Sequence, residues 1–139
     1  MKRLTVIILL SVTCFTANAK GFYQHEKTSE DLVLNHGARW KIDQPTSINV
    51  TRLQQIVGNA NIRTIADYRQ AGNALQAGIN QMIKECRMKG ADHLALHKWL
   101  EPLIENVSRL NRATKAAPAR KIFNTIHIRL GLFHQYFEV

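Results

Sequence analysis

Apolar residues recur at alternating spacings of three and four along two long stretches of the chain, a pattern that places them on one face of an α-helix. The first stretch follows Thr64 and the second follows Gly90, a residue expected to break the helix, with Asp92 expected to cap the next one. The first series is Ile65, Tyr68, Gly72, Leu75, Ile79, Met82 and Cys86, and the second is His93, Leu96, Leu100, Leu103, Val107 and Leu110. Both series are typical of helices in a bundle. Pro102 lies inside the second helix and is expected to kink it, unless the local structure compensates for the missing backbone hydrogen bond.

Two shorter patterns predict a helix on each side of this pair. Pro45-Thr46-Ser47 is a helix-start signal with a hydroxyl available as N-cap, and the helix is expected to end between Gly58 and Asn61. A last helix is expected after the break at Ala116-Ala117-Pro118. The predicted inward positions are Leu53, Ile56, Val57 and Ala60 on the first of these helices, and Ile122, Phe123, Ile126, Leu130, Phe133 and Phe137 on the last.

No stretch shows strand-like alternation, so the sequence predicts an all-α protein. Four helices with short connections favour an antiparallel up-down four-helix bundle over residues 45–139. Residues 20–44 lack periodicity and are expected to form an irregular N-terminal arm, with Trp40 as its anchor on the bundle.

The first 19 residues have the features of a secretory signal peptide. Lys2 and Arg3 precede an apolar run from Leu4 to Phe15, which is followed by the small-x-small site Ala17-Asn18-Ala19. The run is shorter than the roughly 20 residues that span a bilayer as a helix. We therefore expect cleavage after Ala19 and a periplasmic or secreted protein that does not span the membrane.

Charge and cysteine content narrow the choice of partners. The whole chain has a formal net charge of +9, and removing the two basic residues of the expected signal peptide leaves +7. For an exported chain this favours an acidic periplasmic protein or an anionic membrane surface over nucleic acid, unless the charge serves solubility alone. Cys86 would be the only remaining cysteine, so it is buried and inert, bound to a metal, or paired with a second chain in a dimer.

The segment from Cys86 to His97 is the strongest candidate for a functional site. Cys86 and His93 occupy the inward positions of consecutive helices on either side of a turn, and His97 lies one turn after His93 on the same face. In an up-down bundle the last helix ends at this same end. The predicted metal ligands are therefore Cys86, Met88, His93 and His97, with His134 as a further candidate.

A thiolate, a thioether and imidazoles favour copper, while zinc held by Cys86, His93, His97 and a fourth ligand is the alternative. The predicted function is metal handling or sensing without catalysis. Two other interpretations stay open. The same residues can simply pack the hairpin, and the basic protein can be a non-catalytic interaction or inhibitor module that binds no metal.

Two stretches resemble a family of small exported bacterial helical proteins of unknown function. Residues 34–41 match an L-N-x-G-x-x-W-K pattern, and residues 86–97 match C-x-M-K-G-x-x-H-x-x-L-H. The resemblance implies a helical exported protein and places Cys86, Met88, His93 and His97 on the pattern. His36 falls at a variable position of the first stretch, which argues against it as a ligand.

Overall fold

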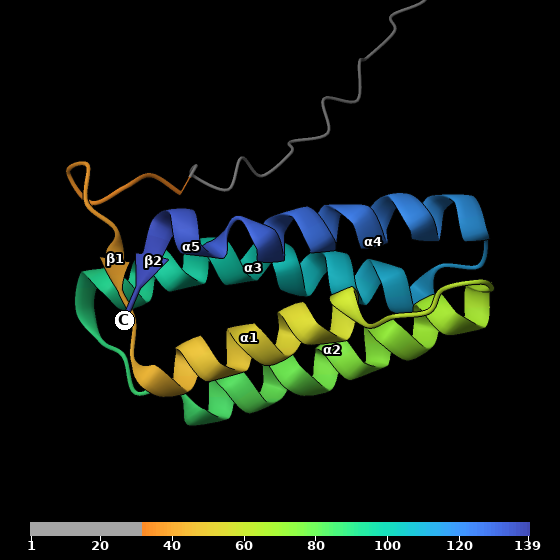
Figure 1. Ribbon diagram of the computed structural model, residues 1–139, viewed down its shortest axis with the longest axis horizontal. Coiled ribbons are helices and arrows are strands. Elements are labelled where there is room, and N and C mark those ends of the chain that lie inside the picture. The colour runs from red at the N-terminus through yellow and green to blue at the C-terminus, as the bar shows by residue number, and fades with distance from the viewer. Residues whose placement is uncertain (1–31) are drawn as a thin grey trace, which may run out of the picture.

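The computed structural model describes residues 32–139, and four long helices account for most of this part of the chain. Neighbouring helices run antiparallel along one common axis, which confirms the predicted all-α bundle (Figure 1). The predicted signal peptide, residues 1–19, and residues 20–31 of the predicted arm lie outside the described residues. The elements are β1 (Trp40–Lys41), α1 (Gln44–Gly58), α2 (Ile65–Glu85), α3 (Gly90–Arg112), α4 (Ala116–Gly131), α5 (Phe133–Tyr136) and β2 (Phe137–Glu138).

The hydrophobic core contains most of the inward positions that periodicity predicts. On α2 the positions from Tyr68 to Met82 are all buried, and on α3 the series from Leu96 to Leu110 is buried as well. The core also holds Trp99, which is only 2% exposed and lies outside the predicted series. Its ring packs edge-on against Phe133, with ring centroids 4.7 Å apart, and Phe133 stacks on Phe137. An aromatic cluster therefore closes one end of the core.

The helix starts differ in detail from the sequence-based expectations. Asp43, and not a hydroxyl of the Pro45-Thr46-Ser47 segment, is the N-cap of α1, because its carboxylate accepts from the Thr46 amide. Lys89 is the N-cap residue of α3, so Asp92 lies in the first turn. There Asp92 accepts a hydrogen bond from the backbone amide of Lys41. It therefore ties the arm to the bundle.

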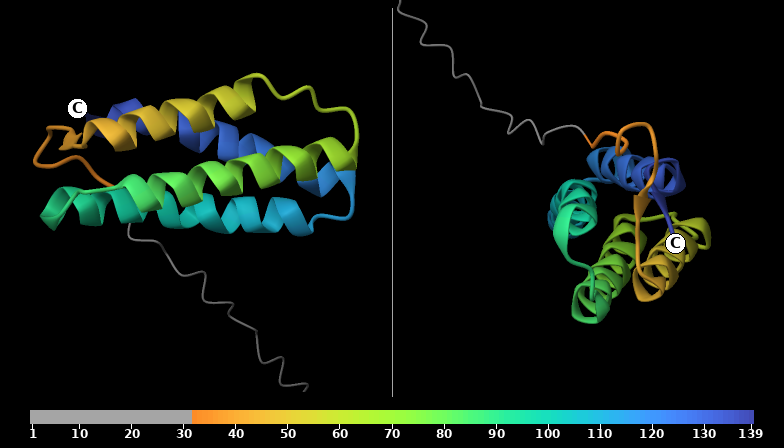
Figure 2. Two further views of the ribbon diagram at one scale, coloured as in Figure 1. Left: turned by 90° about the horizontal axis from the view of Figure 1, so that it is seen from below. Right: turned by 90° about the vertical axis from the view of Figure 1, so that its left-hand side faces the viewer.

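A short parallel strand pair corrects the expectation of a chain without strands. Trp40 of β1 pairs with Phe137 of β2, and Lys41 pairs with Glu138. The Glu138 carboxylate lies 2.7 Å from Arg39 and 2.6 Å from Lys41. The pair lies at the end where α1 begins and α2 connects to α3 (Figures 1 and 2). Trp40 packs partly buried against the core, as expected of an anchor.

No helix among residues 32–139 has the length and apolar character needed to cross a lipid bilayer.

Helices α2 and α3 approach closely at Gly72. A Cβ atom added there would collide with the side-chain oxygen of Asn111 and lie 3.4 Å from Leu110. The Asn111 oxygen is buried, and the Cγ atom of Asn111 and the side chain of Leu110 also lie 3.1 and 3.4 Å from the added Cβ, so relieving the collision requires local repacking.

We expect Gly72→Ala to lower the free energy of unfolding by about 1–3 kcal/mol, because the extra methyl group overpacks this contact. Urea unfolding followed by circular dichroism would measure it. Gly58→Ala is the matched control, since nothing lies within 4 Å of a Cβ at Gly58. It should change stability by less than about 1 kcal/mol. Equal effects of the two substitutions would contradict the close approach.

Candidate functional site at the α2–α3 connection

Cys86, His93 and His97 line one small pocket at the connection between α2 and α3. Cys86 directly follows the last residue of α2, and the two histidines lie in the first turns of α3. The pocket has a volume of about 120 Å³. Its other lining residues are Met82, Ile83, Leu96 and Leu100. The predicted convergence of the thiol and two imidazoles on one end of the bundle therefore holds for these three residues.

The two imidazoles face each other across one helical turn. Their Nε2 atoms are 3.1 Å apart, and the rings meet edge-on with centroids separated by 4.6 Å. His93 is half-buried and His97 is exposed, so one ring borders the core and the other borders solvent. At this distance the two nitrogens can share one proton in a hydrogen bond or bind one ion between them.

The start of α1 holds the α2–α3 connection in place. The Asp43 carboxylate accepts from the backbone amides of Thr46 and Arg87, each at 2.9 Å, so one side chain caps α1 and fixes the connection. The buried Asn49 amide donates to Glu85 at the end of α2 at 2.6 Å. Cys86 is thus held between two residues whose partners lie on α1.

The hydrogen bonds that Asp43 and Glu85 accept set the ionisation of their carboxyl groups. Partial burial acts to raise the pKa of Asp43, but hydrogen bonds from Thr46 and Arg87 outweigh it and hold the pKa below its usual value. Hydrogen bonds from Asn49 and Gln81 likewise lower the pKa of Glu85. Both groups stay anionic at neutral pH, as the network requires.

Two of the predicted ligands lie away from this pocket. Met88 lies on the connection itself, where its sulfur accepts a hydrogen bond from the Thr46 hydroxyl at 3.7 Å. His134 is exposed on α5, and its ring packs edge-on against Phe133. The last helix does not run on to Phe137 as expected: α4 ends at Gly131, and His134 lies on the separate short helix α5, outside the lining of this pocket. His36 is exposed in the turn before β1.

Within the part of the chain that the structure describes, no three His, Cys, Asp or Glu side chains form a group that could hold a metal ion. The pocket therefore combines a histidine pair with a nearby cysteine, and these three side chains do not form such a group.

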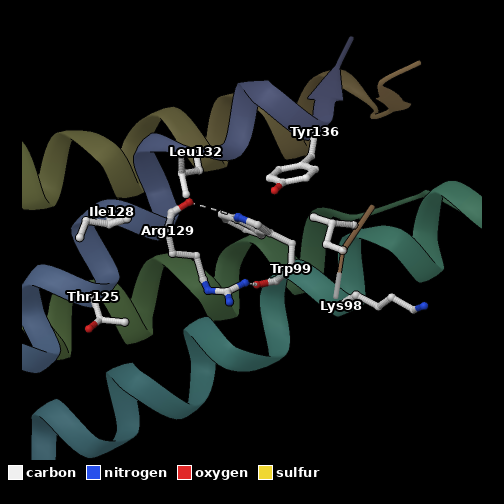
Figure 3. Close-up of a pocket in the computed structure, with 8 residues that line it drawn as sticks. Lys98, Trp99, Thr125, Ile128, Arg129, Leu132 and Tyr136 are labelled. Atoms are coloured by element: carbon white, nitrogen blue, oxygen red, sulfur yellow. Dashed lines mark hydrogen bonds between the residues drawn. The ribbon is translucent and has the colours of Figure 1, made fainter. Parts of the chain in front are cut away.

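Sequence analysis missed a second, larger pocket of about 370 Å³ between α3 and the α4–α5 segment (Figure 3). Its central residues are Trp99, Arg129 and Tyr136. The only signal in the sequence is that Arg129 immediately precedes the inward residue Leu130, which puts a cation at the edge of the apolar face.

Comparisons of the chain with protein-family models, curated proteins and solved structures find no match. The resemblance to exported helical proteins therefore stays a prediction that rests on residues 34–41 and 86–97.

We expect Asp43→Asn to cost about 1 kcal/mol of stability at pH 7, because an amide nitrogen replaces one of the two accepting oxygens. The wild-type pKa is lowered on folding, so the carboxylate stabilises the protein above the unfolded pKa of about 3.9. This stability is lost as the pH falls through the folded pKa. The difference between variant and wild type should therefore shrink below about pH 4.

Denaturant unfolding at a series of pH values would measure this difference. Glu101→Gln, at an exposed position of α3, is the control and should leave stability nearly unchanged. A difference between Asp43→Asn and wild type that is constant from pH 7 to pH 3 would show that the carboxylate does not anchor the connection.

Proposed function

We propose that the protein is an exported metal-binding protein that handles or senses a soft transition metal, copper first, at the pocket formed by Cys86, His93 and His97. The observation that carries the proposal is the 3.1 Å separation of the two imidazole Nε2 atoms. A tetrahedral ion with bonds of about 2.0–2.1 Å holds two nitrogen ligands roughly 3.4 Å apart. The pair therefore needs only a small adjustment to chelate one ion.

Cys86 supplies the third ligand in this proposal. It lines the same pocket from the end of α2, and its side chain is half-buried. In the metal-bound state its thiolate turns toward the two imidazoles. A thiolate with two imidazoles suits copper and also zinc. The bound metal would also protect the unpaired thiol of Cys86 from oxidation outside the cytosol. Met88 is not required, since its sulfur is engaged by Thr46.

The rigid setting of the connection supports a binding role. Asp43 holds the backbone amide of Arg87 and Asn49 holds the side chain of Glu85, one on each side of Cys86, so little ordering would be needed when the ion binds. The proposal assigns no catalytic step to the site. The expected signal peptide supports a location in the periplasm or outside the cell.

The test is an anaerobic titration of the reduced protein with Cu(I) against a competing chelator, repeated with Zn(II). We expect one ion per chain, with affinity falling at lower pH because the ligands must lose protons. Cys86→Ser, His93→Ala and His97→Ala should each weaken binding at least tenfold.

The matched controls are His127→Ala and His134→Ala, since both histidines are exposed and neither lines the pocket. Both controls should bind like wild type. Binding that the pocket substitutions leave unchanged, or that His134→Ala weakens equally, would rule out this site.

The second candidate is the non-catalytic interaction or inhibitor module. It is favoured by the net charge of +9 and by two large apolar side chains, Ile83 and Leu94, that are 54% and 66% exposed near the same connection. This function requires salt-sensitive binding to an acidic protein or an anionic membrane and no dependence on metal. A dimer through Cys86 would appear as a species sensitive to reducing agent.

A further inference from the structure

The larger pocket lies on the α3–α4 side of the bundle and is independent of the histidine pair. Figure 3 shows its walls, which are formed mainly by one turn of α3 and by the α4–α5 segment. Leu32, before β1, completes the lining. Its volume of about 370 Å³ falls at the lower end of the range for small-molecule sites, roughly 300–1,000 Å³. The residues that matter to the argument are Trp99, Thr125, Ile128, Arg129, Leu132 and Tyr136.

Two reciprocal hydrogen bonds fix the charged group of this pocket. The Arg129 guanidinium donates to the carbonyl oxygen of Trp99 at 3.1 Å, and the Trp99 indole donates to the carbonyl oxygen of Arg129 at 3.3 Å. The arginine therefore bridges α3 and α4, and its side chain is held across the pocket (Figure 3). A guanidinium has five N–H donors, so most of its hydrogen-bonding capacity remains for a ligand.

Arg129 is a half-buried cation without a carboxylate partner in the described region. The salt bridges among residues 32–139 both involve Glu138, and neither involves Arg129. Burial lowers the pKa of Arg129, which reflects the cost of removing its charge from water. An anion bound against it would offset this cost, and a planar carboxylate matches the two-pronged geometry of the guanidinium.

The surroundings of the cation are apolar and aromatic. Ile128 is 63% exposed and Leu132 is 38% exposed at the rim, while the ring of Trp99 is buried behind them. The Tyr136 hydroxyl is directed into the pocket (Figure 3). The site therefore combines the fixed guanidinium of Arg129, a second basic side chain, Lys98, a hydroxyl and an apolar wall, a composition typical of sites for small amphipathic ligands.

We propose that this pocket binds a small organic anion, a carboxylate carried on a short aliphatic or aromatic body, with Arg129 contacting the carboxylate and Ile128, Leu132 and Trp99 contacting the body. The volume fits one such molecule. Because the pocket shares no lining residue with the pocket of Cys86, His93 and His97, binding of the carboxylate does not depend on metal.

The test uses octanoate as the probe, with octanamide as its uncharged analogue and octylammonium as its cationic one. Binding to the full protein is measured by calorimetry and by the fluorescence of Trp99 in a Trp40→Phe background. We expect octanoate to bind at least tenfold more tightly than octanamide, and octylammonium not to bind. Excess EDTA should change nothing, which separates this site from the proposed metal site.

Arg129→Gln should weaken octanoate binding at least tenfold while leaving octanamide binding unchanged. Arg120→Gln is the charge-matched control on the same helix, because Arg120 is exposed and lies nine residues away, about 13 Å along the helix axis. If Arg129→Gln fails to fold, Ile128→Glu serves instead, since this exposed rim position should tolerate substitution. Its control is Ile83→Glu, at a similarly exposed position outside the pocket.

Several outcomes would overturn the proposal. Equal affinities for octanoate and octanamide would show that Arg129 does not recognise the anion. Equal losses of octanoate affinity in Arg120→Gln and Arg129→Gln would indicate a general electrostatic attraction to the basic surface. Absence of octanoate binding, together with binding of the protein to an acidic polypeptide or to anionic vesicles, would assign the cationic surface to a macromolecular partner.

Discussion

The Asp43 carboxylate is the contact on which the arrangement at one end of the bundle depends. One oxygen caps α1 and the other holds the backbone of the α2–α3 connection, so a single charge joins two segments that are 44 residues apart. Because both acceptors are used by backbone amides, the contact fixes the chain path and not merely a side-chain position. The pocket of Cys86 and the two histidines is a consequence of this path, since its residues lie on either side of the connection that Asp43 anchors.

The fold could be predicted from the sequence because most of its information lies in local periodicity. The spacing from Ile65 to Met82 defines a helix face regardless of what packs on it, and the break expected at Gly90 lies directly after the observed connection of residues 86–89, with Gly90 itself beginning α3. Helix caps were harder to predict from the sequence, because Asp43, Thr46 and Ser47 are all competent N-caps, and the bond from Arg87 that supports Asp43 is a tertiary contact. The β1–β2 pair depends on residues at opposite ends of the chain and leaves no local pattern.

The candidate sites could likewise be predicted only where nearby residues in the sequence determine them. Cys86, His93 and His97 could be brought together by counting turns across one short connection, because few degrees of freedom intervene. Placing His134 required knowing that the last helix ends at Gly131 and that a separate short helix follows, which the apolar spacing through Phe137 does not reveal. The pocket around Arg129 could not be anticipated, because an arginine beside an apolar face is usually solvated, and its burial follows from the bonds it exchanges with Trp99.

The parallel pairing of β1 with β2 also has a consequence for the order of folding. It joins residues 97 positions apart, whereas the bundle forms mainly through contacts between helices that follow one another in the chain. Loop-closure entropy makes so distant a contact costly until the helices between its ends have packed. The pair is therefore expected to form last and to open first. Its transient opening would free the C-terminal residues and residues 32–41 together, making these segments the expected first sites of proteolysis.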